Sequence, residues 1–123
     1  ARGSLAATGV DAEASLVLTA AGGATAVLDH SLLTPMPTTA VLFGSRGWAE
    51  LGASFYAPTR LVVQVDDAEP QVHELTDRRA GFVGELEEVA RCLQEGRAQS
   101  DVMPLSETVA AARVLDEARR QLG

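Results

Sequence analysis

The two histidines are the side chains of this chain best suited to proton transfer or metal binding. His30 stands between Asp29 and Ser31, which are the residue types of a hydrolase triad. Neighbours along a strand point to opposite faces, so Asp29 and His30 are not expected to meet. His30 alone remains a candidate for lining a pocket. His73 lies among acidic residues without metal-ligand spacing, which favours a solvated acidic loop over a metal site. These acidic residues are Asp66, Asp67, Glu69, Glu74 and Asp77.

Cysteine and lysine usage removes several other chemistries. Cys92 is the single cysteine, so an internal disulfide and a cysteine-based metal cluster are excluded. It falls beside an apolar helical stripe, which favours a small buried hydrophobe over a nucleophile. The chain has no lysine, and therefore no Schiff base or lysine general acid. It also has no G-x-G-x-x-G fingerprint, and residues 44–47 (Gly-Ser-Arg-Gly) are interpreted as a turn between strands. We assign no catalytic residue and no metal ligand.

One cluster has modest appeal as a binding site. Phe55, Tyr56 and Arg60 combine two aromatic rings with a guanidinium, which suits a sugar or another ring-shaped substrate. The alternative is a loop that its own aromatic side chains anchor. We carry the three residues forward as a tentative substrate pocket.

The elements that must position these residues change type halfway along the chain. Hydrophobic alternation and β-branched residues predict strands over 13–19, 25–33, 38–44, 48–51 and 59–65, and residues 66–77 are expected to form a loop or an irregular edge. A helical stripe then runs from Phe82 through Leu86 to Leu93, with Gly96 as its C-cap. Leu86→Ala is therefore expected to cost roughly 2–5 kcal/mol. A second helix is expected after Ser106 as N-cap. The class is α+β, with an open, mostly antiparallel sheet and two C-terminal helices packed on one face.

Size and charge bound the function. The chain has 123 residues and 12.9 kDa, which predicts a single domain over residues 1–123. A net charge of −7 argues against a nucleic-acid partner. No stretch approaches the roughly 20 apolar residues of a membrane span, so we expect a cytoplasmic protein without a membrane partner. All ten basic residues are arginine, and lysine, asparagine and isoleucine are absent, which suggests a GC-rich bacterial genome.

The predicted sheet has more apolar surface than two helices can cover. Leu61 and Val63 alternate with Val62, and Leu16 and Leu18 with Val17, so apolar side chains fall on both faces. Large exposed apolar patches are uncommon on monomers. We therefore expect a homo-oligomer, most simply a dimer, through the uncovered face of the sheet.

Several motifs appear together in a recognisable order. They are Thr8-Gly9-Val10-Asp11, residues 39–47 (TAVLFGSRG), residues 55–61 (FYAPTRL), Gly84-x-x-x-Glu88-Val89-x-x-Cys92-Leu93-x-x-Gly96, residues 103–107 (MPLSE) and residues 114–121 (VLDEARRQ). In this order and spacing, the chain from Thr8 to Gly123 resembles the C-terminal domain of the Gfo/Idh/MocA family (glucose–fructose oxidoreductase and inositol dehydrogenase). The likeness is strongest to its dihydrodiol dehydrogenase-like members.

The resemblance implies a substrate and oligomerisation domain that lacks its N-terminal Rossmann partner. That partner would bind NAD or NADP and supply the catalytic lysine, so this chain alone is expected to hold no cofactor and to be non-catalytic. The whole protein would be an NAD(P)-dependent oxidoreductase acting on a sugar, polyol or diol. The alternative is a free-standing interaction module without redox activity.

Overall fold

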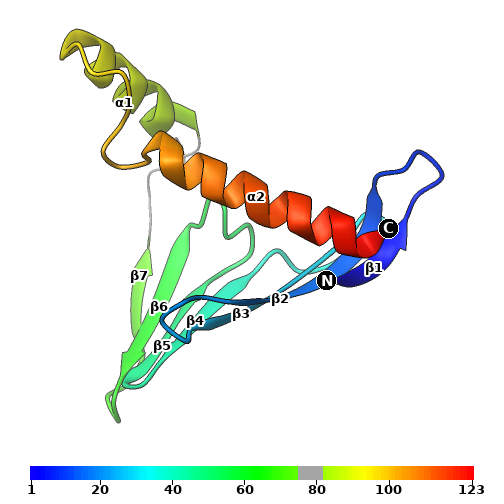
Figure 1. The fold of residues 1–123 in the computed structure, drawn as a ribbon. Coiled ribbons are helices and arrows are strands. Elements are labelled where there is room, and N and C mark those ends of the chain that lie inside the picture. Colours follow the sequence, from blue (N-terminus) through cyan, green and yellow to red (C-terminus); the bar gives the residue numbers. More distant parts are fainter. Residues whose placement is uncertain (75–81) are drawn as a thin grey trace. The chain divides into compact units, whose positions relative to one another are not determined.

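The computed structural model describes residues 1–74 and 82–123. These residues form two compact units, Ala1–Met36 with Gln99–Gly123, and Pro37–Ala98. Strands precede helices, and every strand pairing is antiparallel, so the α+β class with open antiparallel sheets is confirmed (Figure 1). The elements are β1 (Arg2–Leu5), β2 (Asp11–Thr19), β3 (Thr25–Ser31), β4 (Ala40–Gly44), β5 (Gly47–Leu51), β6 (Arg60–Val65), β7 (Gln71–Glu74), α1 (Phe82–Gln94) and α2 (Leu105–Leu122).

The strands form two sheets where the sequence patterns predicted one. The first sheet has the order β1-β2-β3 and the second β4-β5-β6-β7. The sequence patterns did not predict β1 and β7. Each is an edge strand of four residues, which is too short to show a clear hydrophobic alternation. β7 lies inside the segment expected to be a loop or an irregular edge. Residues 75–77 of that segment lie outside the described residues.

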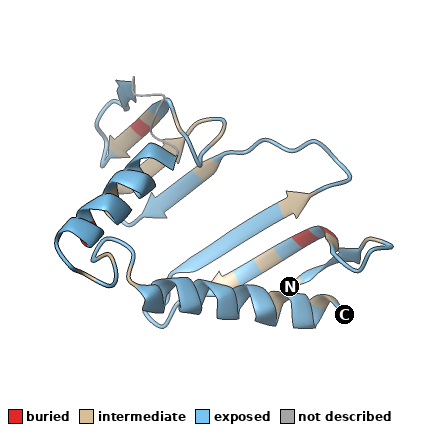
Figure 2. Ribbon diagram, turned by 90° about the horizontal axis from the view of Figure 1, so that it is seen from above, coloured by how far each residue is buried: buried red, intermediate tan, exposed pale blue. Residues whose placement is uncertain are grey.

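In the first unit, α2 packs on β1 and β2 (Figures 1 and 2). Ala12 and Ala14 of β2 are buried, with 3% and 5% of their surfaces exposed. The opposite face of this sheet is mostly polar, apart from the paired Val17 and Val27. The expectation of apolar residues on both faces is therefore wrong for most of this sheet, because strand alternation here separates apolar from polar side chains almost cleanly.

In the second unit, apolar side chains do lie on both faces of the sheet. Hydrogen-bonded register places one set together, which we call the apolar face: Ala40, Leu42, Ala49, Leu51, Leu61, Val63 and Val65. The other face, called the mixed face, carries Val41, Phe43, Trp48, Glu50, Arg60, Val62, Gln64, Val72 and Glu74. On the mixed face the Trp48 indole N–H donates to Gln64 Oε1 at 2.7 Å, and Val62 is 7% exposed. A charge at Val62 would therefore perturb the fold itself.

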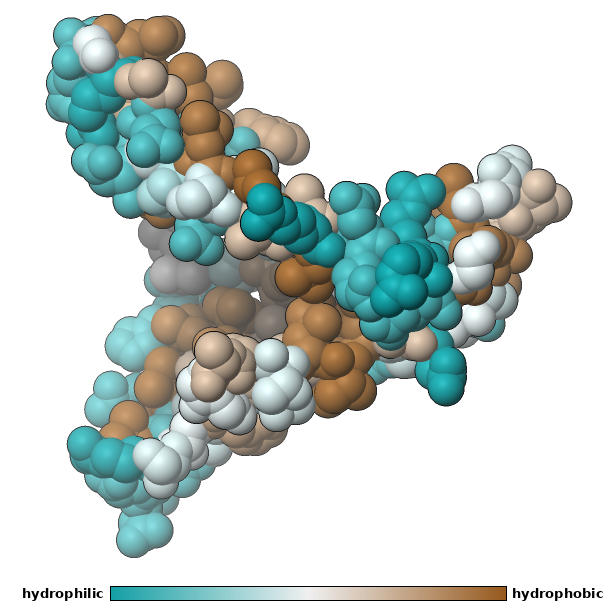
Figure 3. Space-filling model, in the orientation of Figure 1, coloured by the Kyte–Doolittle hydropathy of each residue, from teal (hydrophilic) through white to brown (hydrophobic). Residues whose placement is uncertain are grey.

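α1 does not contact the strands of its own unit within the described residues. Its apolar stripe is exposed: Phe82 79%, Leu86 68%, Val89 56% and Leu93 73%. Figure 3 shows this hydrophobic side of the helix beside a hydrophilic one. The predicted packing of α1 on a sheet face, and with it the large cost of Leu86→Ala, does not hold here. A hydrophobic period of 3.6 residues predicts that a helix has an apolar stripe, but it does not predict which surface packs against that stripe.

The ends of the helices show one confirmed cap and one correction. Gly96 has φ +67°, its N–H donates to Leu93 O at 3.1 Å, and the Arg97 N–H donates to Cys92 O at 2.8 Å. This is the Schellman arrangement expected of a C-cap glycine. α2 begins at Leu105, with Pro104 in the N-cap position and no side-chain cap, so Ser106 is in the first turn instead. Proline suits this helix end because it has no N–H to leave unpaired. Neither α1 nor α2 has both the length and the hydropathy that a bilayer crossing would require.

The C-terminal part of α2 carries a carboxylate, Glu117, whose pKa is well below its ordinary value. Arg120 donates to both oxygens of Glu117, at 2.5 and 2.9 Å, and Gln121 donates at 2.7 Å. The Arg120 hydrogen bonds, then that of Gln121, lower the pKa of Glu117 to about 2. A lowered folded-state pKa contributes stability above the ordinary value of 4.5 and loses it as the pH falls toward 2.

We expect carboxyl ¹³C NMR to show Glu117 titrating near pH 2. Arg120→Gln should raise this midpoint toward the ordinary value, because it removes the main donor. Arg119→Gln is the matched control, since it removes an adjacent charge that makes no ion pair with Glu117. Equal midpoints in the two variants would contradict the assignment.

Candidate functional site

A β-bulge changes the direction of one acidic side chain in the first sheet. Ser4 pairs with Glu13, but the next residue, Leu5, pairs with Asp11, so Ala12 is an extra residue in β2. Regular alternation would place Asp11 on the polar face with Glu13. The extra residue reverses this and brings Asp11 to the face covered by α2. Bulges of this kind often redirect side chains at functional sites.

The redirected carboxylate meets His30. The distance from His30 Nε2 to Asp11 Oδ2 is 2.9 Å, and both side chains are about two-fifths exposed. Asp29 takes the opposite face, where its Oδ1 accepts a hydrogen bond from Ser15 Oγ at 2.5 Å. The prediction that Asp29 and His30 do not converge is therefore confirmed. Asp11 was missed because its partner depends on the bulge, which hydrophobic alternation does not reveal.

His30 and Asp11 line a groove between α2 and the first sheet, with a volume of about 420 Å³. The groove is open because three of the residues in its wall are alanines, whose side chains are small. Asp116 and Arg119 bring further charge from α2. In the sequence, Asp116 and Arg119 are three residues apart and adjoin the apolar stripe of the helix. This i, i+3 spacing was the sequence signal that could have identified them as neighbours on one side of the helix. The remaining wall is apolar and consists of Ala14, Leu16, Ala112, Leu115, Ala118 and Leu122.

The tentative substrate pocket of Phe55, Tyr56 and Arg60 lies in the second unit. Phe55 and Tyr56 occupy the β5–β6 loop, with ring centroids 6.0 Å apart in an edge-to-face arrangement. The Phe55 N–H donates to Thr38 O at 2.9 Å, which holds the loop against the start of its own unit. Arg60 opens β6, opposite Glu74. Tyr56 is 72% exposed and available to a ligand, and the assignment of these three residues to a pocket stays a prediction.

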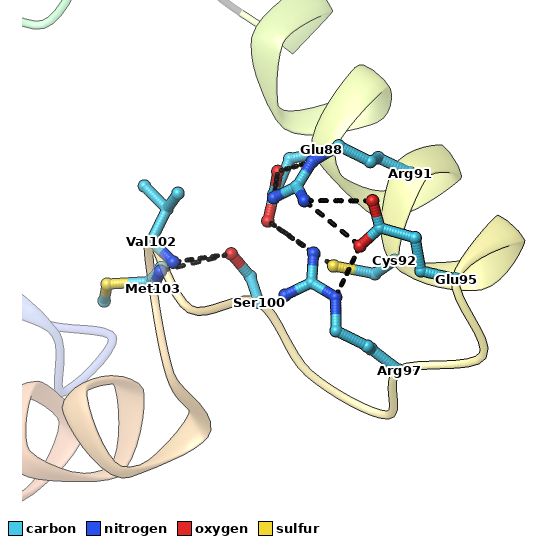
Figure 4. Close-up of polar contacts among 8 residues, drawn as sticks. All are labelled: Glu88, Arg91, Cys92, Glu95, Arg97, Ser100, Val102 and Met103. Carbon is cyan, nitrogen blue, oxygen red and sulfur yellow. Dashed lines mark hydrogen bonds and ion pairs between the residues drawn. The ribbon is translucent and has the colours of Figure 1, made fainter.

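Cys92 lies within a network of charged side chains at the end of α1 (Figure 4). Its thiol donates a hydrogen bond to Glu88 Oε1 at 3.4 Å. The guanidinium of Arg91 forms ion pairs with Glu88 at 2.6 Å and with Glu95 at 3.2 Å. Burial, then the hydrogen bond to Glu88, raises the pKa of the Cys92 thiol. Because the thiolate is the reactive form, a raised pKa disfavours a nucleophilic role. The interpretation of Cys92 as a small buried side chain, 6% exposed, is confirmed.

The described residues do not fit a dinucleotide or a metal centre. A dinucleotide site needs a strand, a glycine-rich turn and a helix within a parallel β-α-β unit. Every strand pairing among residues 1–74 and 82–123 is antiparallel, so these residues contain no parallel β-α-β unit. Within residues 1–74 and 82–123, no group of three or more potential ligand side chains gathers around a point.

Comparison with known proteins finds several relatives that share one name. The chain is 30% identical over 128 residues to trans-1,2-dihydrobenzene-1,2-diol dehydrogenase of Xenopus tropicalis, and this alignment covers the whole chain but 39% of the relative. It is 34% identical to the mouse protein of that name and 32% identical to the human one, with 94% of the chain and 36% of each relative covered. No family model matches the chain.

The chain is homologous to the C-terminal part of these dihydrodiol dehydrogenases. The resemblance to dihydrodiol dehydrogenase-like members of the Gfo/Idh/MocA family, inferred from the ordered motifs, is confirmed. The chain spans less than two-fifths of the length of these dihydrodiol dehydrogenases. The relatives named here are vertebrate proteins, and the bacterial origin inferred from composition stays a prediction.

Proposed function

We propose that this chain is the C-terminal substrate and oligomerisation part of an NAD(P)-dependent oxidoreductase that acts on a diol, polyol or sugar. The observation that carries the proposal is the alignment of the whole chain with the C-terminal part of the dihydrodiol dehydrogenases. The absence of lysine and of a dinucleotide fingerprint is consistent with this division of labour, because cofactor and catalytic lysine would belong to a preceding Rossmann domain.

Within that enzyme, the two sheets would have different neighbours. The second sheet presents an apolar face free of charged residues over β4–β6, which suits a subunit interface. The exposed Tyr56 and Arg60 would wall part of the substrate pocket. The cytoplasm is the compartment we propose for the protein, since pyridine nucleotides are soluble intracellular cofactors.

The test is an activity assay on the complete polypeptide that includes this sequence. Purified protein should reduce NAD or NADP when it is given trans-1,2-dihydrobenzene-1,2-diol, and absorbance at the nicotinamide band reports the reaction. Tyr56→Phe and Arg60→Gln should raise KM more than they lower kcat if they contact the substrate. Arg46→Gln is the matched surface control, because its ion pair with Asp66 is well exposed.

Two outcomes would overturn the proposal. One is a complete polypeptide without a dinucleotide fingerprint upstream of Ala1, which would favour the free-standing interaction module. The other is a protein that binds NAD(P) but oxidises no diol, polyol or sugar.

A further inference from the structure

Two apolar surfaces of the second unit have no partner among residues 37–74 and 82–98. One is the apolar stripe of α1, whose four side chains are each more than half exposed: Phe82, Leu86, Val89 and Leu93. The other is the apolar face of the sheet, on which Leu42 is well exposed. α1 contacts no described strand, so the stripe does not cover the face within one copy of the chain. Large exposed apolar patches are uncommon on monomers, so both surfaces are candidates for an interface.

The stripe and the face suit each other in shape and chemistry. The stripe residues follow one another at spacings of four, three and four, so they lie along one side of the helix. Packing such a stripe on an apolar sheet face is a standard way for an α+β protein to form a second layer. The apolar face carries no charged residue over β4–β6, so a helix placed there would bury no unpaired charge of the sheet.

The charges of α1 disfavour a contact between two copies of this helix. α1 carries Glu85, Glu87 and Glu88, and its single arginine, Arg91, already pairs with Glu88 and Glu95. Two α1 helices side by side would therefore bring like charges together, which is unfavourable. The uncharged sheet face avoids this repulsion.

The area that each arrangement would bury also separates them. Covering the stripe would remove about 400 Å² of helix surface from water, since an aromatic side chain contributes about 150 Å² and each aliphatic one about 80 Å². Two stripes packed on each other would bury about 800 Å² in total, which is below the roughly 1,200 Å² of a stable specific interface. Two helix-on-sheet contacts would bury about 1,600 Å², because each sheet loses a similar area, and this is the standard size of a stable interface.

We propose that the chain forms a two-fold dimer in which α1 of each copy packs its apolar stripe on the apolar face of the other copy. The occupant of each surface is a second copy of this chain. A two-fold axis makes the two contacts equivalent, so both stripes and both faces are covered at once. A dimer of sheet against sheet would cover the two faces alone and leave both stripes in water.

Two single substitutions test the two surfaces separately by sedimentation equilibrium. Leu86→Glu places a charge in the stripe, and Leu42→Glu places one in the apolar face. Each should raise the dimer dissociation constant at least about a hundredfold, because each would bury an unpaired charge at both contacts. Circular dichroism and amide dispersion should show that both variants stay folded, since both side chains are exposed in the single copy.

Gln94→Glu is the matched control on α1. It adds the same charge to the same helix, but Gln94 lies one residue after Leu93 and therefore about 100° around the helix from it. We expect its dissociation constant to equal that of the unmodified chain.

An equimolar mixture of the two variants tests whether the contact runs from one copy to another. In a mixed dimer, the unaltered α1 of the Leu42→Glu copy meets the unaltered face of the Leu86→Glu copy, so one of the two contacts is intact. We expect mixed dimers at concentrations at which each variant alone is monomeric.

Four results would overturn the inference. They are an unmodified chain that stays monomeric at tens of micromolar, dissociation by Leu42→Glu alone (a sheet-to-sheet dimer), dissociation by Leu86→Glu alone (a helix-to-helix dimer), and a mixture that dimerises no better than its components. The inference deepens the oligomerisation part of the proposed function, and its readout is a mass and not a turnover. A dimer of this kind in a protein that oxidises no diol, polyol or sugar would therefore sink the oxidoreductase proposal alone.

Discussion

Leu42→Glu should convert the chain from a dimer to a monomer and leave its fold intact. Leu42 lies on the apolar face of the second sheet and is 60% exposed, so a glutamate there needs no internal rearrangement. In a two-fold dimer the residue would be buried, and an unpaired buried charge costs several kcal/mol. Sedimentation equilibrium at micromolar concentration should give about twice 12.9 kDa for the unmodified chain and about 12.9 kDa for the variant.

Phe43→Glu supplies the matched control on the neighbouring residue. Phe43 is 82% exposed, but strand alternation places it on the mixed face, where Glu50 and Gln64 interrupt the apolar surface. We expect this variant to remain a dimer. If Phe43→Glu dissociates the chain and Leu42→Glu does not, the interface is the mixed face. A chain that is monomeric throughout would contradict association through either face of this sheet.

Gly47→Ala should destabilise the second unit by about 3 kcal/mol or more, which is typical of substitutions that strain the backbone and overpack a site. Gly47 has φ +154°, and a Cβ on its backbone would lie 1.9 Å from the carbonyl oxygen of Gln64 on β6. That oxygen belongs to the backbone of the neighbouring strand and has no freedom to rotate away. The expected result is a lower urea midpoint and faster amide exchange in β5 and β6.

Gly44→Ala is the control for this prediction, because Gly44 is the register partner of Gly47 in the same hairpin. A Cβ there would meet its nearest atom at 3.7 Å, an ordinary contact, so the cost should stay below about 1 kcal/mol. Similar midpoints for the two variants would show that β5 and β6 do not approach as closely as described.

The sequence by itself determined the class of the fold and the family of proteins that the chain resembles. Alternation over 13–19 and 59–65 and the helical stripe of α1 are local patterns, and local patterns are set by the period of side-chain direction along a strand or helix. The Gly96 cap followed from a local requirement as well, since a left-handed residue after a helix favours glycine. Ordered motifs from Thr8 to Gly123 identified the relatives without any coordinates.

Tertiary structure decided what these patterns pack against. α2 contacts β1 and β2, whereas α1, the more amphipathic of the two helices, contacts no described strand and leaves its apolar stripe exposed. Alternation placed Val62 on the face opposite Leu61 and Val63, but it did not show that Val62 is buried, with 7% of its surface exposed. Asp11 reached His30 only through a bulge that one extra residue creates. A site built from residues on two strands and a helix depends on register, and register is a property of paired strands that a single strand's sequence does not contain.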